Sequence, residues 1–324
     1  MQIPSQESNS SLVESSLNQI TYLHSCAITP KIFWENYQKP GKPVVLTGLL
    51  EHRPEWNLEF LNDRLGDRKF PVRFYGKERY KQDKGTWQNI GSGVESRSMR
   101  FSEYAQKLLN GEADEKDMYL GKCSLKNTPL ADLPQINQAQ AQIGIKNPVT
   151  DFNLWCGLGG HTTCLHCDPF DGTLIQLYGK KKVILFPPDQ LYNLYPFSLI
   201  NHLRYGLKMR ASYSRVYPQQ PDFALFPKFK EAFSQRLEVV LNEGEILFIP
   251  NGWWHEVTSL GEGVVCSINI FWHITPLSRA LSSWNKWRIH LASILAAPHI
   301  LKAWLAAIIS QNKEQKLRHL IQRL

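Results

Sequence analysis

The segment Thr163-Cys-Leu-His-Cys-Asp-Pro-Phe-Asp171 concentrates side chains that can bind a metal ion. Cys164 and Cys167 have the Cys-x-x-Cys spacing of many zinc sites, while His166 and Asp168 offer an imidazole and a carboxylate. The segment could therefore hold zinc through sulfur, or iron through nitrogen and oxygen. It could also be an ordinary strand that carries polar residues.

Strand geometry separates the two metal hypotheses. Residues two apart on a strand share a face, so His166 and Asp168 can point the same way while Cys167 points to the other side. A zinc knuckle needs a turn between its cysteines, but no Gly, Pro or Asn lies between Cys164 and Cys167. The sequence also contains no second Cys-x-x-Cys. It therefore favours iron over zinc.

A third ligand for iron is available in the segment Ile249-Pro-Asn-Gly-Trp-Trp-His-Glu-Val257. His255 lies there on an expected strand that begins just after a turn. Two histidines and one carboxylate form the facial triad of non-haem iron oxygenases, which leaves three coordination positions open. A 2-oxo acid can occupy two of these positions and dioxygen the third. The alternative is that His166 and His255 are core histidines satisfied by hydrogen bonds.

The elements that must position these residues are mostly strands. Short apolar runs separated by turn residues fill positions 150–275, as is typical of an antiparallel β-sandwich or barrel. Before them, we expect helices over 57–65 and 102–109, the second capped by Ser102. After Pro276 two amphipathic helices are predicted, with Pro298 between them. Their apolar faces carry Trp284, Trp287, Leu291, Trp304, Leu305 and Ile308.

Composition places the chain among globular proteins, with 324 residues of which 43% are hydrophobic and 20% charged. Residues 1–27 are polar and are expected to be a flexible leader, not a signal peptide, so the six cysteines should be reduced thiols in a cytoplasmic protein. The net charge of +8 is concentrated in the loop 198–221 and in residues 276–324. These segments could bind nucleic acid or an anionic membrane, or could be solvated. A charged residue and a proline within the last apolar run argue against a membrane span.

Several motifs in order along residues 28–275 resemble the JmjC-type 2-oxoglutarate oxygenases. They are similar to the small hydroxylase branch that includes the asparaginyl hydroxylase inhibiting hypoxia-inducible factor. The matching pieces are KPVVLTGLL, YLGKCSL, NLWCGLGGHTTCLHCDPFDGTLIQLYGKKKVILFPPDQ, LYP, PDFALFP, LNEGEILFIPNGWWHEVTSL and SINIFW.

The resemblance implies a mainly β fold, a double-stranded β-helix or cupin-like jelly roll, with N-terminal α/β flanking elements and C-terminal helices. The catalytic domain would cover 28–275 with its barrel core at about 150–275, and residues 276–324 would form a helical segment. The family's iron ligands fall on His166, Asp168 and His255.

The resemblance also assigns residues to the cosubstrate. Lys181 would pair with the distal carboxylate of 2-oxoglutarate, assisted by Thr163 and Tyr119, and Asn269 would lie near the metal-bound end. Strand parity puts Thr163 on the face opposite His166, so that assignment needs a kink in the strand. Lys181 could instead belong to a solvated lysine turn, and Tyr119 and Asn269 could be packing residues.

The function implied is an Fe(II)- and 2-oxoglutarate-dependent dioxygenase that hydroxylates a C–H bond of a protein or peptide side chain and releases succinate and CO2. Alternatives are the same chemistry on a nucleic acid base or small metabolite, and a catalytically silent cupin-like module. Lysine demethylation is less favoured because no histone-reading module is recognisable. The family also implies a homodimer through the C-terminal helices, with binding to an anionic membrane surface as the alternative.

Overall fold

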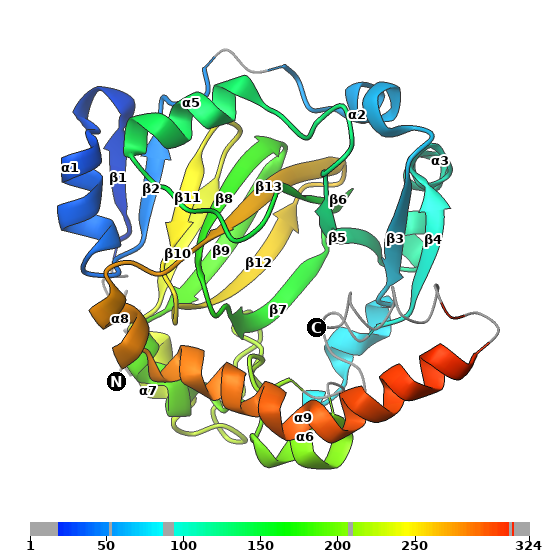
Figure 1. The fold of residues 1–324 in the computed structure, drawn as a ribbon, viewed down its shortest axis with the longest axis vertical. Helices are drawn as coiled ribbons and strands as arrows, with labels where there is room; N and C mark the ends of the chain where they lie inside the picture. Colours follow the sequence, from blue (N-terminus) through cyan, green and yellow to red (C-terminus); the bar gives the residue numbers. More distant parts are fainter. Residues whose placement is uncertain (1–18, 52–53, 87–93, 207–209, 311–312, 314–324) are drawn as a thin grey trace, which may run out of the picture.

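The computed structural model describes residues 19–51, 54–86, 94–206, 210–310 and 313. Two antiparallel sheets face each other and form a jelly-roll barrel, which confirms the predicted fold class (Figure 1). The smaller sheet has the strand order β10-β9-β12-β7, and the centre of the larger sheet has the order β11-β8-β13-β6. Their bounds are β6 Asn153–Leu158, β7 Thr162–Cys167, β8 Asp171–Tyr178, β9 Lys180–Phe186, β10 Leu237–Leu241, β11 Ile246–Ile249, β12 Trp254–Leu260 and β13 Val264–Trp272.

Strands from the N-terminal half extend the larger sheet at both edges. Strand β2 pairs with β11 and in turn carries β1 in parallel, and β5 pairs with β6 and leads to β3 and β4. Their bounds are β1 Thr21–His24, β2 Val44–Thr47, β3 Lys69–Phe74, β4 Ser96–Arg100 and β5 Met118–Ser124. Strand β1 corrects the prediction of a flexible leader over 1–27, because residues 21–24 are hydrogen-bonded into the sheet; residues 1–18 lie outside the described part.

Helices cover the outer face of the larger sheet, and their apolar residues form the largest core cluster with it. The helix expected at 57–65 is α2, capped by the side chain of Asn57. The helix expected at 102–109 starts one residue earlier, and its cap is Arg100 in place of Ser102, because Glu103 bonds the Arg100 amide. The bounds are α1 Pro30–Phe33, α2 Leu58–Leu65, α3 Phe101–Leu109, α4 Glu112–Glu115, α5 Pro134–Ile143, α6 Ile200–Tyr205 and α7 Phe229–Ser234; a π-helical turn covers Trp34–Gln38.

The C-terminal segment forms a short helix, α8 Leu277–Ser282, and a long one, α9 Trp284–Ile309. Helix α9 runs beneath the barrel in Figure 1 and packs against α6. The prediction of two helices separated at Pro298 is therefore wrong, because α9 continues through it. Proline removes one amide donor, which leaves the carbonyl of Ile294 without its helical bond. Ile294 is 67% exposed, so water can satisfy that carbonyl.

Helix α9 has its small and polar residues toward the protein and its large apolar residues toward solvent. Asn285, Arg288, Ala292 and Ala296 are buried. The opposite side, called here the outer face of α9, carries exposed Trp284, Trp287, Leu291, Ile294, Leu301, Trp304, Leu305, Ile308 and Ile309. By length and composition alone α9 could also cross a membrane. The orientation of α9 is the reverse of that of an ordinary surface helix, whose apolar stripe faces the core.

Candidate metal and cosubstrate site

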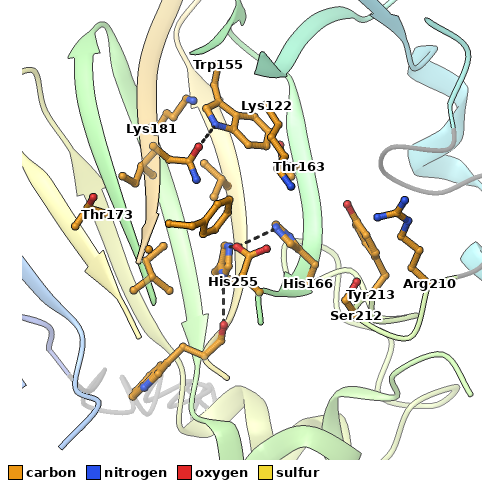
Figure 2. A pocket seen from close by; sticks show the side chains of 18 of the residues that line it. Lys122, Trp155, Thr163, His166, Thr173, Lys181, Arg210, Ser212, Tyr213 and His255 are labelled. Atoms are coloured by element: carbon orange, nitrogen blue, oxygen red, sulfur yellow. Dashed lines mark hydrogen bonds and ion pairs between the residues drawn. The ribbon is translucent and has the colours of Figure 1, made fainter. Parts of the chain in front are cut away.

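His166, Asp168 and His255 lie together at one end of the barrel. His166 is near the end of β7, Asp168 follows that strand, and His255 faces His166 directly in the antiparallel register with β12. The two ring centroids are 4.3 Å apart, and Asp168 Oδ2 lies 3.5 Å from His255 Nε2 and 4.0 Å from His166 Nε2. One ligand atom from each residue lies within 4.8 Å of the others (Figure 2).

Hydrogen bonds fix both imidazoles with the same nitrogen toward the site. Nδ1 of His166 lies 2.9 Å from the Cys164 carbonyl oxygen, and Nδ1 of His255 lies 3.1 Å from that of Trp253. A carbonyl only accepts, so each Nδ1 carries the hydrogen and each Nε2 keeps a lone pair for a metal. Burial and the nearby His255 lower the pKa of His166 to about 4. Burial opposes ionisation of Asp168, but the neighbouring His255, His166 and Lys122 lower its pKa to about 2.

The thiols of the segment take no part in this arrangement. Cys164 and Cys167 are buried and form no disulfide, and Cys164 packs in a small apolar cluster with Phe197. Burial raises the pKa of Cys167 far above its ordinary value. Within the described part of the chain, the three residues His166, Asp168 and His255 form the one group with ligand geometry.

Lys181 is buried within the barrel at 2% exposure. Its ammonium donates to the Ser267 hydroxyl at 2.6 Å and to the Tyr119 hydroxyl at 3.2 Å. Burial lowers its pKa to about 8. None of the salt bridges formed by the described residues involves Lys181, so this buried cation has no anionic partner among them. The carboxylate of a bound ligand would supply the missing negative charge.

The neighbouring lysines point elsewhere. Lys182 lies on the other side of β9 and pairs with Glu238 at 2.8 Å, while Lys180 is exposed. Gly179, just before the strand, has a φ of +69°, a conformation that glycine adopts without strain. This turn sets the register that directs Lys181, and not its neighbours, into the barrel.

The structure contains the kink that the assignment of Thr163 needs. Along β12, Val257 pairs with Thr163 and His255 pairs with His166, so two steps on β12 match three steps on β7. This β-bulge turns both Thr163 and His166 toward the same cavity. Thr163 and Lys181 both line that cavity.

Tyr119 and Asn269 hold the surroundings of the cavity in place. Tyr119 is buried, stacks on His161 with ring centroids 3.7 Å apart, and contacts the Lys181 ammonium from behind. Asn269 lines the cavity, and its Oδ1 accepts a hydrogen bond from Trp155 Nε1 at 2.8 Å. The sequence does not identify Trp155 as a site residue, because this tryptophan lies in a segment with the pattern of an ordinary apolar strand.

Cationic and aromatic side chains form the outer wall of the cavity, whose volume is about 160 Å³. Arg73 and Lys122 come from β3 and β5, and Arg210 and Tyr213 come from a loop. Sequence reasoning misses Arg73 and Lys122 and places the other two in a basic loop for nucleic acid. Nothing local marks them, because the fold brings them together over long sequence separations. Ser267 is missed for the same reason.

Residues 210–217, called here the pocket loop, are joined to the metal-binding strand. The Cys167 amide donates to the Ser212 carbonyl at 2.9 Å, and the Ser214 amide donates to the Leu165 carbonyl at 3.0 Å. Tyr213 stacks on His166 at 5.2 Å, with Arg210 beyond it (Figure 2). The basic segment 198–221 therefore contributes to the cavity wall, although Lys208 lies outside the described residues.

The residues that line the cavity fit both a metal ion and a short dicarboxylic acid. Two neutral imidazoles and one carboxylate on one side of an open cavity are a donor set for non-haem iron. The buried ammonium of Lys181, with hydroxyls of Ser267 and Tyr119 around it, suits the far carboxylate of a short dicarboxylic acid. The site thus fits Fe(II) and 2-oxoglutarate.

Most of the chain is similar to known proteins. The cupin-like domain family matches residues 30–278. The lysine-specific demethylase JMJ30 of Arabidopsis thaliana is 31% identical over 252 residues, covering 74% of this chain and 52% of the relative. The lysine-specific demethylase 8 of Xenopus tropicalis is 29% identical over 254 residues, covering 74% and 50%. The human HSPB1-associated protein 1 is 33% identical over 156 residues, covering 47% and 30%.

These matches bear out the resemblance at the level of the family. The chain spans about half the length of the first two relatives. The nearer likeness to the asparaginyl hydroxylase branch stays a prediction, since these relatives carry other names. The match over residues 30–278, together with the jelly-roll barrel and its His-Asp-His group, establishes that the chain belongs to the cupin-like domain family as a JmjC-type member.

Proposed function

We propose that the chain is an Fe(II)- and 2-oxoglutarate-dependent dioxygenase that hydroxylates a C–H bond of a protein or peptide side chain. One observation carries the proposal: three ligand atoms from His166, Asp168 and His255 lie within 4.8 Å of one another on the wall of a cavity that Lys181 also lines. Together these residues offer separate places for a metal and for a dicarboxylic acid.

The reaction balances without a further reductant. One atom of dioxygen enters the substrate C–H bond as a hydroxyl group, and the other enters the new carboxylate of succinate. Dioxygen accepts four electrons, two from 2-oxoglutarate as it loses CO2 and two from the substrate. When bound, iron and 2-oxoglutarate would activate dioxygen for this reaction.

In this proposal, the residues of the chain bind and orient the metal and the cosubstrate. The Cys164 and Trp253 carbonyls hold the two imidazoles with Nε2 toward the metal position. Lys181 holds the far carboxylate of the cosubstrate, Ser267 and Tyr119 fix the ammonium, and Thr163 and Asn269 lie on the wall of the same cavity. The proposed cofactor-binding set is thus Lys181, Thr163, Tyr119 and Asn269.

The test is 2-oxoglutarate turnover. Purified chain with Fe(II), 2-oxoglutarate and dioxygen should form succinate slowly even without substrate, and Asp168→Ala should abolish this because a site with two ligands holds iron weakly. A catalytically silent cupin-like module would form no succinate with any metal. The substrate would then be sought with labelled dioxygen, as a gain of one labelled oxygen in proteins of a cell extract.

Lysine demethylation is the second candidate, and the printed names of two relatives favour it. It begins with the same hydroxylation, on an N-methyl carbon, and ends with release of formaldehyde. Formaldehyde detection on methylated peptides separates the two. A nucleic acid base or a small metabolite remains the other alternative, supported by exposed Arg204 and Tyr205 beside the basic loop.

The proposal also covers the division of the chain into domains and its compartment. Residues 28–275 would be the catalytic domain and 276–324 a separate helical segment. None of the six cysteines forms a disulfide, and Cys26 is exposed, which supports a reducing compartment such as the cytoplasm.

A homodimer through the C-terminal helices is proposed for the outer face of α9. Its exposed large apolar residues form a stripe of a kind that a soluble monomer rarely presents to water. Two-fold pairing of identical helices would cover both stripes at once. The rival occupant is an anionic membrane surface, which would match the tryptophans and the absence of acidic residues between 276 and 313.

Light scattering on the wild type and on Leu291→Gln/Ile294→Gln/Leu305→Gln tests this proposal. The three changes lie on the outer face and leave the buried residues of α9 intact. We expect a dimeric wild type and a monomeric variant with the same circular dichroism. A monomeric wild type that floats with liposomes of anionic lipid would reject the dimer in favour of the membrane.

A further inference from the structure

Three cationic side chains surround the entrance to the cavity, beyond the residues assigned to the metal and the cosubstrate. They are Arg73 on β3, Lys122 on β5 and Arg210 on the pocket loop. The Lys122 side chain is exposed at the cavity. Partial desolvation and the charges of Arg210 and Arg73 lower its pKa, while the charge of Asp168 raises it, so Lys122 lies near two cations and near the carboxylate of the metal-binding group. A cluster of charged groups of this kind in a cavity marks a candidate site for a ligand.

A break in the regular strand directs Lys122 into the cavity. On a regular β5, Lys122 would share a face with Leu120 and lie opposite Tyr119. Instead Leu120 and Cys123, three residues apart, both pack in the outer core, while Tyr119 and Lys122 face the barrel. The register between β5 and β6 shifts between these positions, and Lys122 has a φ of +53°. Non-glycine residues rarely adopt this left-handed conformation, and here it accompanies the bulge that brings Lys122 to the cavity.

Arg73 is fixed next to this bulge. Its Nη1 donates to the Gly121 carbonyl at 2.6 Å. A Cβ atom at position 121 would lie 2.7 Å from the same Nη1, so only glycine leaves room for the guanidinium. Neither Arg73 nor Lys122 takes part in a salt bridge among the described residues.

The charges of the site do not cancel once its cofactors are bound. Four cations, Arg73, Lys122, Lys181 and Arg210, and one acid, Asp168, line the cavity, which leaves three positive charges. A divalent metal adds two positive charges and 2-oxoglutarate brings two negative ones. The loaded site therefore keeps three positive charges at its entrance, where the substrate must enter.

We propose that the substrate side chain that enters this cavity is acidic, an aspartate or glutamate of a protein, with its carboxylate held by Lys122, Arg73 and Arg210. The proposal rests on the dioxygenase function proposed above. A carboxylate on a short side chain suits a cavity of about 160 Å³ that must also hold the cosubstrate. Trp253, Tyr213 and Phe271 are the aromatic walls on which its methylene groups would lie.

This inference departs from the names of the relatives. A methylated lysine would bring a further positive charge next to three cations in a partly enclosed site, where like charges repel strongly. An amide side chain would bring no negative charge to Arg73 and Lys122. A carboxylate brings one negative charge, which offsets one of the three positive charges counted in the lining.

The experiment uses peptide pools with randomised flanks that differ only in the central residue: Asp, Glu, Asn, Gln, dimethyl-Lys or phospho-Ser. The full-length chain, loaded with Fe(II) and 2-oxoglutarate under labelled dioxygen, should oxidise the Asp or Glu pool at least tenfold faster than the matching amide pool. Succinate formed without peptide is measured in parallel. Its absence would remove the dioxygenase function itself, whereas succinate without preference for the acidic pools would overturn only the substrate class.

Variants tie the preference to Lys122. Lys122→Met should raise KM for the acidic pool at least tenfold, and Lys122→Arg should restore most of the loss because it returns the positive charge. Lys180→Met, a lysine exposed on the barrel exterior, is the matched control and should keep the preference. An acidic preference that survives Lys122→Met, or faster oxidation of the dimethyl-Lys or phospho-Ser pool, would overturn the proposal.

Discussion

Replacing Lys181 with methionine should have opposite effects on stability and on cosubstrate binding. Burial lowers the pKa of this lysine from 10.5 to about 8. Each pKa unit corresponds to about 1.4 kcal/mol, so the buried charge costs the cofactor-free chain roughly 3 kcal/mol at neutral pH. Methionine removes that cost, but it also removes the donors to Ser267 and Tyr119, worth about 1 kcal/mol each. Lys181→Met should therefore stabilise the cofactor-free chain by about 1 kcal/mol.

The same change should weaken 2-oxoglutarate binding. A buried carboxylate that loses its charged partner costs roughly 3–5 kcal/mol, which corresponds to a roughly hundredfold to few-thousandfold weaker Kd. Calorimetric titration of 2-oxoglutarate into Fe(II)-loaded protein without oxygen measures this, and thermal melting of the cofactor-free protein measures the stability. Lys180→Met is the control, since that lysine is exposed.

The pH dependence gives an independent check on Lys181. Its folded pKa is lower than its unfolded pKa, so the unfolded chain binds more protons between pH 8 and 10.5. Its contribution to stability therefore rises with pH across that window. The melting temperature of Lys181→Met should be above that of the wild type at neutral pH and should fall below it by about pH 10.5, where the cost of the buried charge is gone. An unchanged Kd for 2-oxoglutarate, or an equal loss in Lys180→Met, would refute the assignment of Lys181.

Three further predictions concern the metal and the pocket loop. Asp168→Ala should lose the bound iron while Cys164→Ser keeps one metal per chain, as measured by elemental analysis; the reverse pattern would mean a sulfur site. Arg288→Met should lower the free energy of unfolding by roughly 2–4 kcal/mol in urea titrations, because it loses two charged hydrogen bonds to backbone carbonyls. Burial lowers the pKa of His202 to about 4, and its Nε2 accepts from the Ala211 amide at 2.8 Å. Hydrogen exchange at Ala211 should therefore speed up as pH falls from about 6.5 to 4, relative to His202→Gln; an equal change in both proteins would contradict this role.

The positions of the strands along the chain, and the turns between them, could be predicted from the sequence because they depend on local patterns; the order of the strands within the two sheets could not. Alternating apolar residues and turn dipeptides marked the barrel over about 150–275, and the structure has its barrel strands between Asn153 and Trp272. The ligand group followed from strand parity at His166 and Asp168 together with a family resemblance. Its geometry required only that two strands pair side by side.

The features that could not be predicted depend on irregular strands and on contacts between residues far apart in the sequence. Parity reasoning assumes an unbroken strand, so it could demand a kink at Thr163 but could not locate the bulge that moves Lys122 inward. The helical break expected at Pro298 failed because one missing amide bond at a solvent-exposed turn is tolerable. Arg73 and Ser267 reach the cavity through pairings across the sheet that no short window of sequence contains.

The inner side of α9 joins the end of the chain to the catalytic cavity. The Arg288 guanidinium donates to the carbonyls of Phe197 and Ala211, and Ala211 lies between Arg210 and the residues that pair with the metal-binding strand. A partner or bilayer that shifted α9 would therefore move one cation of the entrance. By thermodynamic reciprocity, a substrate that drew Arg210 inward would change the affinity of α9 for whatever covers its outer face by the same factor. Attachment at the outer face of α9 and binding of a substrate in the cavity would then be coupled through Arg288 and the pocket loop.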